Sequence, residues 1–234
     1  MRPVSRIARA YPDRVEVRGR DLAGDVMGRL SFTEYFHLLL TGEEPTEEQR
    51  FFLDLLLVSI AEHGMMPTNV AARMTLAADP ESLQGAVAAG ILGAGPVVLG
   101  TSEDCAKLLA EGGEPAEIVR RHREAGVKVP GFGHPVHKPL DPRAERIIEL
   151  ADERGVSGPN VALARALRAE LGLVMNVSMP IAAVMLDLGF PPAAVKAVPI
   201  LARTASLLAH LAEERELPLG FVLARAAEEA VEYE

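Results

Sequence analysis

The segment VPGFGHPVHKPLDPR, residues 129–143, interrupts a sequence that is otherwise dominated by helical patterns. Pro130, Pro135 and Pro139, together with Gly131 and Gly133, do not fit the hydrogen bonding of a regular helix, so a structured loop is predicted over 126–141. Asp141 followed by Pro142 then offers an N-cap acid and a first-turn proline. A new helix is therefore predicted from residue 142.

Short sequence motifs before this loop predict a strand and the starts of two helices. Residues 14–19 alternate polar and apolar side chains, which predicts a short strand or hairpin arm. Ser31 with Glu34, and Thr46 with Gln49, fit the capping box that begins a helix. Apolar residues follow each box at helical spacing, as expected for core-facing helices.

Two further helices are predicted over 71–78 and 81–92, with Asp79-Pro80 beginning the second. From Gly85 onward the second helix is apolar all round, which predicts burial. Its small residues would allow close approach to a neighbouring helix. That neighbour could belong to this chain or to a second copy across a dimer interface.

Helical patterns resume after the loop, over about 142–155, 159–171, 179–188, 192–213 and 218–231. The chain shows no internal repeat and no low-complexity linker. These patterns predict an all-α protein with a single β signal near its start.

Composition limits the classes of function. The 234 residues suffice for one globular unit, and no run of about 20 apolar residues predicts a membrane span. We expect no membrane partner, and a cytoplasmic protein because no secretory signal is readable at the start. The net charge of −9 argues against a nucleic-acid partner. Cys105, the only cysteine, is expected to be a small core residue.

Basic side chains nevertheless gather around one segment. They could attract a small anionic ligand, or they could belong to a solvated helix face and helix end. The residues concerned are Arg120, Arg121, Arg123, Lys128, Lys138, Arg143 and Arg146.

His134 and Arg143 are the side chains of the loop that could carry chemistry. His134 lies among glycines, where a ligand can approach the backbone closely, and it could act as acid, base or hydrogen-bond donor. Arg143 offers a planar set of donors suited to a carboxylate. A loop histidine is also commonly structural, and spacing alone leaves both readings open.

The segment from Gly131 to Arg143 resembles the glycine-histidine loop of citrate synthases and citryl-CoA lyases. The resemblance extends upstream to residues 38–46, which are similar to an early helix and turn of the family. It extends downstream to residues 185–192 and 201–210, which are similar to the late helices. It covers most of the chain in the same order, in a shorter form than the usual family member.

The resemblance implies a role for each matching position. His134 would hold the oxygen that is a ketone in the synthase direction and the citryl hydroxyl in the lyase direction, and would remove the hydroxyl proton in cleavage. His63, Arg143 and Arg203 would bind substrate. Main-chain groups of the loop would surround the adenine of CoA, and a basic residue would meet its phosphate. These cofactor positions are Val129, Pro130, Gly131, Phe132, Gly133 and Lys138.

The sequence departs from the family at two positions. Val98 stands where synthases carry the histidine that steadies the enolate of acetyl-CoA, and lyase-type relatives can lack that histidine. Ser178 occupies the place of the catalytic aspartate, and a serine hydroxyl is a poor general base near neutral pH. Asp187 and Glu214 are possible replacements, although both have the pattern of helix-surface acids.

The resemblance thus predicts a citrate-synthase-like helical bundle with a short N-terminal β hairpin. Residues 1–104 with 206–234 would form a large lobe, and residues 105–205 a small lobe that carries the CoA loop. A homodimer is implied on the same grounds.

The predicted function is carbon–carbon cleavage of the citryl-CoA lyase type, or reversible synthase-type acyl transfer, on a CoA thioester of a di- or tricarboxylic acid. CoA or acetyl-CoA would be substrate or product, without a tightly bound cofactor or metal. The alternative is a catalytically impaired partner subunit that binds CoA or a carboxylate. A purely structural helical bundle would leave the loop around His134 unexplained.

Overall fold

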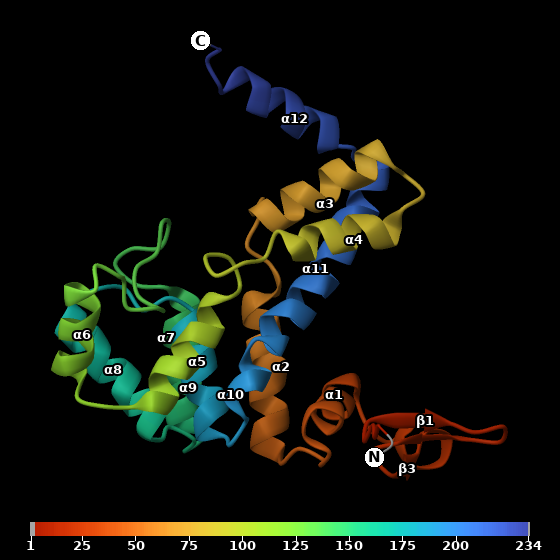
Figure 1. Ribbon diagram of the computed structural model, residues 1–234, viewed down its shortest axis with the longest axis horizontal. Coiled ribbons are helices and arrows are strands. Elements are labelled where there is room, and N and C mark those ends of the chain that lie inside the picture. Colours follow the sequence, from red (N-terminus) through yellow and green to blue (C-terminus); the bar gives the residue numbers. More distant parts are fainter. Residues whose placement is uncertain (1–2, 234) are drawn as a thin grey trace. The chain divides into compact units, whose positions relative to one another are not determined.

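The computed structural model describes residues 3–233 and confirms an all-α fold with a small sheet. Within that range the chain has twelve α-helices (Figure 1). It divides into two compact units, Met1–Leu55 and Leu56–Glu234. The lobe boundaries near residues 105 and 205 stay a prediction.

The first unit begins with a three-stranded antiparallel sheet in the order β1-β2-β3. Its strands are β1 (Ala8–Ala10), β2 (Val15–Val17) and β3 (Arg20–Asp21). The pattern over 14–19 correctly predicted β2 and its hairpin. The flanking strands are too short to show an alternating pattern, so they were not predicted. A short π-helical segment, Leu22–Val26, follows the sheet.

Both predicted capping boxes are confirmed. At the start of α1 (Phe32–Thr41), the Ser31 amide donates to Glu34 Oε2 at 2.7 Å and the Glu34 amide donates to Ser31 Oγ at 3.3 Å. At the start of α2 (Glu47–Ala61), Thr46 and Gln49 make the equivalent bonds at 2.9 and 3.2 Å. These reciprocal bonds satisfy amides that a helix start otherwise leaves unpaired.

The second unit holds the remaining helices. The helices predicted after the loop are confirmed, except that Lys196 separates the stretch 192–213 into two helices. Their bounds are α3 (Pro67–Ala78), α4 (Leu83–Leu92), α5 (Thr101–Glu111), α6 (Pro115–Glu124), α7 (Pro142–Glu153), α8 (Pro159–Leu171), α9 (Ser178–Asp187), α10 (Pro192–Val195), α11 (Ala197–Glu216) and α12 (Gly220–Glu229).

Helices α3, α4 and α11 pack together in this unit, as Figure 1 shows. Their shared core consists of Ala72, Leu76, Ala86, Leu207 and Leu211, all buried. Gly90 permits the close approach, since a Cβ there would lie 2.7 Å from Leu207 Cδ1 and 2.9 Å from the Thr68 carbonyl oxygen. The small residues of α4 therefore serve packing within this chain, at least at Gly90.

Two expectations for α4 are wrong. The helix begins after Ser82, whereas Asp79 ends α3 and accepts a hydrogen bond from the Ser82 amide at 3.1 Å. The predicted all-round burial also fails, because only Ala86 and Gly90 of α4 are buried and Leu92 is 84% exposed. An apolar pattern indicates which residues favour burial, but it cannot show how many neighbours surround the helix.

A second group of helices surrounds α9, which packs against α5, α7 and α8. Residues Met179 to Met185 of α9 are all buried, so this helix is the centre of the group. Cys105 of α5 is completely buried, and burial raises the pKa of its thiol. The cysteine is thus the core residue that the sequence predicts.

The stretch Pro192–Glu216 is long and apolar enough to cross a membrane by length and composition alone. Half of its most apolar window is buried inside the protein, and α11 packs against α3 and α4. The buried face of α11 also carries Arg203 and Glu214. The core helix of a globular protein meets the same criteria.

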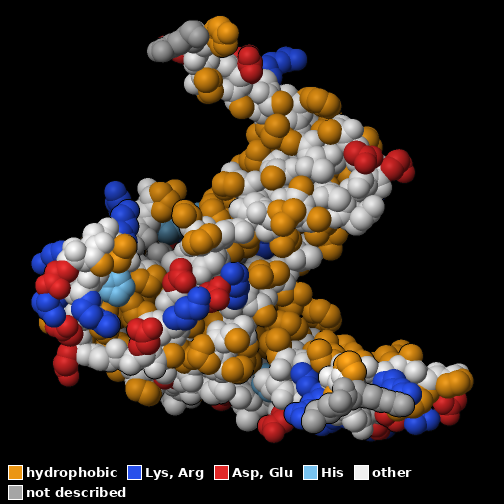
Figure 2. Space-filling view, in the orientation of Figure 1, with side chains coloured by type: hydrophobic (Ala, Val, Ile, Leu, Met, Phe, Trp, Pro, Cys, Tyr) orange, Lys and Arg blue, Asp and Glu red, His pale blue; other side chains and the backbone are white. Residues whose placement is uncertain are grey.

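Apolar side chains remain exposed on the second unit. Figure 2 shows hydrophobic groups spread over the surface of α3, α4 and α12. Leu92, Phe221 and Val222 are 84%, 72% and 59% exposed. A surface of this kind is typical of a contact with another protein chain.

Replacing Gly90 with alanine should destabilise the protein by about 1–3 kcal/mol, because the new Cβ would overlap Leu207 and the Thr68 carbonyl. Urea unfolding measures the change in the free energy of unfolding. Ala88→Ser, at an exposed position of the same helix, is the control and should shift stability by less than about 0.5 kcal/mol. Equal effects of the two changes would contradict the packing described for Gly90.

Candidate functional site

The loop after α6 is held by pairing with residues 174–176. The Gly133 amide donates to the Val174 carbonyl at 2.7 Å, and the Asn176 amide donates to the Gly131 carbonyl at 2.9 Å. Asn176 Nδ2 also donates to the Gly133 carbonyl at 3.0 Å. This short antiparallel pairing, centred on Phe132 and Met175, fixes the glycine segment against the chain that leads into α9.

The pairing decides which backbone groups of the loop remain for a ligand. The bonds of Gly131 and Gly133 flank Phe132, so the amide and carbonyl of Phe132 point away from residues 174–176. Val129 and Phe132 bury their side chains at 7% and 8% exposure. Of the main-chain groups expected to meet adenine, the amide and carbonyl of Phe132 are not used in this pairing, whereas the Gly131 carbonyl and both the amide and the carbonyl of Gly133 are.

Gly131 and Gly133 both have positive φ, at 83° and 85°, which favours glycine. Their surroundings differ. A Cβ at Gly131 would lie 2.7 Å from Cys105 Sγ and 2.8 Å from Met179 Cβ, whereas a Cβ at Gly133 would meet nothing within 4 Å. Gly131 therefore also allows the loop to lie directly on α5 and α9.

Asp141 is completely buried and joins the end of the loop to two helices. It caps α7, as predicted, by accepting from the Arg143 amide at 3.1 Å. Its carboxylate also accepts from Arg143 Nε at 3.0 Å and Nη2 at 2.9 Å, and from the Val177 amide before α9 at 3.2 Å. Burial acts to raise the pKa of Asp141, but the hydrogen bonds and charge of Arg143 outweigh it and lower the pKa below its usual value.

His134 has a defined proton position. Its Nδ1 accepts from the amides of Val136 at 3.1 Å and His137 at 2.9 Å, so the neutral ring carries its proton on Nε2. Arg143 Nη2 lies 3.5 Å from Nε2, which is longer than an ordinary hydrogen bond. Burial, followed by the nearby charge of His137, lowers the pKa of His134. His134 is therefore a neutral hydrogen-bond donor at neutral pH.

Three histidine rings meet at this point. His63, between α2 and α3, lies with its Nε2 3.3 Å from Nε2 of His137. The ring centres of His63 and His134 are 5.5 Å apart, and those of His134 and His137 are 4.3 Å apart. His137 was not predicted as a site residue. The one feature of the sequence that pointed to His137 was its place in the loop, three residues after His134. A loop has no periodic pattern, so the sequence does not show which way a loop side chain is oriented.

Arg203 of α11 is buried, with 2% exposure. Its Nη1 donates to Thr68 Oγ1 at 3.2 Å and Asn69 Oδ1 at 3.0 Å, and its Nη2 donates to the Ile60 carbonyl at 3.4 Å. Its Nε is buried without a hydrogen-bond partner, and no described carboxylate forms an ion pair with it. Burial lowers the pKa of Arg203, although the nearby charge of Glu62 opposes this.

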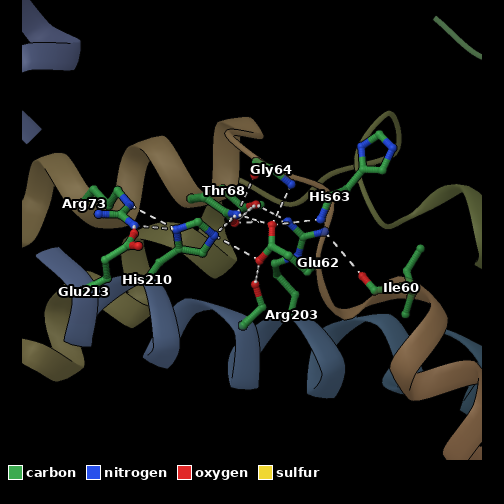
Figure 3. Close-up of polar contacts among 11 residues, drawn as sticks. Ile60, Glu62, His63, Gly64, Thr68, Arg73, Arg203, His210 and Glu213 are labelled. Atoms are coloured by element: carbon green, nitrogen blue, oxygen red, sulfur yellow. Dashed lines mark hydrogen bonds and ion pairs between the residues drawn. The ribbon is translucent and has the colours of Figure 1, made fainter. Parts of the chain in front are cut away.

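A polar network supports the segment that carries His63 (Figure 3). Arg73, completely buried, donates to His210 Nδ1, so Nε2 of His210 carries the proton and donates to Glu62 Oε2 at 3.0 Å. Glu62 also accepts from the amides of His63 and Gly64 at 2.8 and 2.6 Å. Burial would raise the pKa of Glu62, but hydrogen bonds, first from the Ser206 hydroxyl and then from these amides, lower it to about 2. The imidazole of His63 points away from this network in Figure 3.

One cavity of about 340 Å³ brings most of the predicted substrate-binding and catalytic residues together. Its polar lining includes His63, His134, Arg143, Asn176 and Arg203. Val98 and Ser178, the two departures from the family, also line it. The rest is apolar and comes from Ile60, Met66, Val97, Leu99, Val136 and Val177, among others.

No carboxylate among the described residues lines this cavity. The two suggested replacements for the missing aspartate have structural roles. Asp187 accepts from the amides of Gly158 at 2.8 Å and Val161 at 2.9 Å at the start of α8. Glu214 is buried, pairs with Arg73 at 2.8 Å and accepts from the Gly220 amide. The reading of both as helix-surface acids is therefore wrong.

A larger cavity of about 720 Å³ adjoins the first at Gly133 and His134. Lys138 lines it together with Arg165 and Arg168 of α8. The place of these two arginines beside the loop could not be predicted from their spacing in the sequence, because it results from helix packing. Other basic residues of the predicted cluster belong to the helix surface. Arg120 pairs with Glu117 and Glu124, and Arg146 pairs with Glu149 and Glu153.

The family model described as citrate synthase, C-terminal domain, matches residues 6–220. The chain belongs to the citrate synthase family. It is 27% identical over 199 residues to the citrate synthase of Heyndrickxia coagulans, covering 80% of this chain and 53% of that protein. The chain thus spans about half the length of the curated relatives that it matches.

Solved structures show the same fold. A citryl-CoA lyase from Hydrogenobacter thermophilus superposes with a TM-score of 0.83 at 32% identity, covering 90% of this chain and 86% of the other. ATP citrate lyase from Methanothrix soehngenii, solved with citrate and coenzyme A, gives a TM-score of 0.80 at 20% identity. This match covers 93% of this chain and 39% of the ATP citrate lyase chain, and it supports the fold alone.

Gly131→Ala should destabilise the protein by about 1–3 kcal/mol more than Gly133→Ala. Both changes place a side chain at positive φ, but only the first adds overlap with Cys105 and Met179. Thermal and urea unfolding of the two variants, compared with the unchanged protein, provide the measurement. A larger loss for Gly133→Ala would show that the loop does not lie on α5 and α9 as described.

Proposed function

We propose that this chain is an enzyme of the citryl-CoA lyase type. It would cleave, and in reverse form, the carbon–carbon bond of a CoA thioester of a di- or tricarboxylic acid. Similarity to a citryl-CoA lyase over most of both chains supports this direction. Val98 favours the lyase direction further, because the synthase-type histidine that steadies the enolate is missing from a cavity that Val98 lines.

The buried guanidinium of Arg203 is the observation that carries the proposal. A buried charge without a carboxylate partner is costly, and here its Nε has no hydrogen-bond acceptor in the described structure. The cavity that Arg203 lines also contains the donor atom His134 Nε2. A substrate carboxylate on Arg203 would satisfy the charge and bring the substrate to His134.

Arg143 provides a second position for a carboxylate. It donates to Asp141 through Nε and Nη2, so its orientation is set before any ligand binds. We assign its Nη1 to a second carboxylate of the substrate. Two fixed guanidinium groups around one donor histidine match a di- or tricarboxylic acid with a hydroxyl or carbonyl oxygen between its acid groups.

The larger cavity is our proposed place for the phosphates of CoA. Lys138, Arg165 and Arg168 line it, with Arg165 also paired to Asp152 and Arg168 to Glu145, and Gly133 and His134 connect it to the reaction cavity. Val129, Pro130 and Phe132 lie on the same loop, where the amide and carbonyl of Phe132 are not used in the pairing with residues 174–176 and would meet the adenine. CoA or acetyl-CoA is then substrate or product, and no tightly bound cofactor is part of the proposal.

A homodimer in the cytoplasm completes the proposal. The exposed apolar side chains Leu92, Phe221 and Val222 support a contact between copies of the chain. The alternative, a partner subunit that binds CoA or a carboxylate without turnover, is favoured by the missing carboxylate in the cavity. Binding and cleavage measurements distinguish the two.

Calorimetric titration should show binding of citrate and CoA, and purified protein should release acetyl-CoA from citryl-CoA. Arg203→Gln should weaken citrate binding by about 30-fold or more, since losing one partner of a buried charged pair costs at least about 2 kcal/mol. Arg120→Gln, on the surface of α6, is the control and should bind citrate normally.

Each result has a distinct meaning. Binding without acetyl-CoA release would support the partner-subunit alternative. Unchanged citrate affinity in Arg203→Gln would contradict the assigned carboxylate site. Absence of binding to both citrate and CoA would contradict the proposed function as a whole.

Ser178→Asp should increase cleavage about tenfold or more, because it restores a carboxylate that can exchange a proton at the thioester α-carbon. The first turn of α9 tolerates the new negative charge. Initial rates of acetyl-CoA release measure the gain. Ser82→Asp, at the N-cap of α4 outside the cavity, is the matched control and should leave the rate unchanged. No gain in Ser178→Asp would show that this position is not the one that meets the α-carbon.

A further inference from the structure

The described site has a proton donor but no evident group that moves a proton. Cleavage of a citryl-type thioester requires removal of the hydroxyl proton and protonation of the enolate that leaves. His134 Nδ1 is occupied by two amide donors, and its Nε2 already carries the proton. His134 can therefore stabilise the oxygen but has no lone pair facing away from the backbone to accept the hydroxyl proton. Another residue must provide the acceptor.

His63 and His137 have the required chemistry. Their Nε2 atoms lie 3.3 Å apart, so one ring donates its Nε2 proton and the other accepts it. When His63 is the donor, its Nδ1 carries the free lone pair and can act as a base. His63 lines the reaction cavity, whereas His137 lies behind it on the loop. This is the arrangement of a base oriented by a hydrogen-bonded partner.

We propose that His63, oriented by His137, is the acid–base residue of this site, and that His134 acts only as a hydrogen-bond donor to the reacting oxygen. The assignment rests on the proposed lyase function and deepens it. His63 is the catalytic residue, and His137 is a positioning residue that acts through it. The role assigned to His63 by family resemblance, substrate binding, is thereby extended to proton transfer.

The proposed steps balance without an added reactant. His63 accepts the hydroxyl proton, the electrons of the breaking carbon–carbon bond pass to the thioester enolate, and the hydroxyl carbon becomes a ketone. His134 Nε2–H donates a hydrogen bond to the ketone oxygen. His63 then returns its proton to the enolate α-carbon, which yields the acetyl thioester and an oxo acid. One proton has moved from oxygen to carbon, and His63 is neutral again.

The charges around His63 favour both proton transfers, the acceptance of the hydroxyl proton and its return to the enolate carbon. Arg143 and Arg203 disfavour a positive charge on the ring, Asp141 favours it, and His137 and His134 are the other titratable groups facing it. Burial, followed by the charges of Arg143 and His137, lowers the pKa of His63. The ring is therefore neutral and able to accept a proton near neutral pH, and once protonated it is a stronger acid than free imidazole.

A metal centre is the other use of three adjacent histidines, whose nitrogen atoms all lie within 4.8 Å of one another. The hydrogen bonds of His134 oppose it, because its Nε2 carries a proton and its Nδ1 faces two amides. Asp141 is committed to Arg143 and Val177, and two arginines lie close by. Only two ligands would remain, fewer than the three protein ligands of a typical catalytic zinc site.

The first experiment is NMR of the imidazole nitrogens in ¹⁵N-histidine-labelled protein between pH 5 and 8.5, without substrate. His134 should be the Nε2–H form throughout its neutral range, and neutral His63 should also carry its proton on Nε2, which leaves its Nδ1 free to accept a proton. An Nδ1–H form of either His134 or His63 would overturn the proposal whether or not the protein turns over citryl-CoA.

The second experiment follows citryl-CoA cleavage against pH. In the unchanged protein kcat should rise with pH through the lowered pKa of His63 and level off above it. His63→Asn should reduce kcat about 100-fold or more with little change in KM. His137→Asn should reduce kcat less and move the midpoint of the profile to higher pH, since one source of the lowered pKa of His63 is removed. His122→Asn, at a half-buried histidine of α6, is the control and should match the unchanged protein.

The outcomes separate this inference from the proposed function. A raised KM with unchanged kcat in His63→Asn, or an unshifted profile in His137→Asn, would overturn the acid–base assignment while the lyase function stands. Loss of activity on chelation that Zn²⁺ restores would overturn it in favour of a metal centre. No cleavage by the unchanged protein would overturn the proposed function, and the catalytic assignment with it. Thermal unfolding of each variant confirms that it is folded.

Discussion

The buried carboxylate of Asp141 is the interaction on which the site depends. It caps α7, holds the guanidinium of Arg143 and accepts from the Val177 amide that leads into α9. A carboxylate without solvent exposure requires such partners, because an unpaired buried charge would be strongly unfavourable. The same hydrogen bonds that make the burial of Asp141 possible therefore set the positions of the loop, of Arg143 and of the start of α9.

The remaining parts of the site follow from that anchor. With the end of the loop fixed, its glycine segment pairs with residues 174–176, and Gly131 lies directly on Cys105 and Met179. His134 then turns back to accept from the two amides that follow it. The ring is held by its own loop, so its proton position is established by backbone geometry before any ligand arrives.

Local signals in the sequence predicted much of this fold. The capping boxes at Ser31 and Thr46 and the cap at Asp141 depend on residues within three positions of one another, and all three are confirmed. Features that depend on distant neighbours were harder to predict. The start of α4 was misplaced because Asp79-Pro80 forms a turn after α3, and the number of helices around α4 is not encoded in its own pattern.

The residues of the candidate site likewise divide into those that could be predicted from the sequence and those whose roles depend on distant neighbours. His134 and Arg143 could be selected because they lie in one distinctive segment, and family resemblance indicated His63 and Arg203. His137 has no pattern of its own, and its importance appears only through its contact with His63, 74 residues away. The roles of Asp187 and Glu214 were likewise set by long-range partners, the amides at the start of α8 and the guanidinium of Arg73.

Arg203 has a consequence for the protein's lifetime as well as for its chemistry. A guanidinium that is buried without an ion pair, and with its Nε unbonded, lowers the stability of the protein relative to a fully paired core. A carboxylate that binds there acts as a missing part of the core, and it shifts the balance between folded and unfolded chains by mass action. Proteases attack mainly the unfolded chain, so if a carboxylate binds at Arg203 as proposed, the abundance of the protein in a cell would follow the supply of that carboxylate.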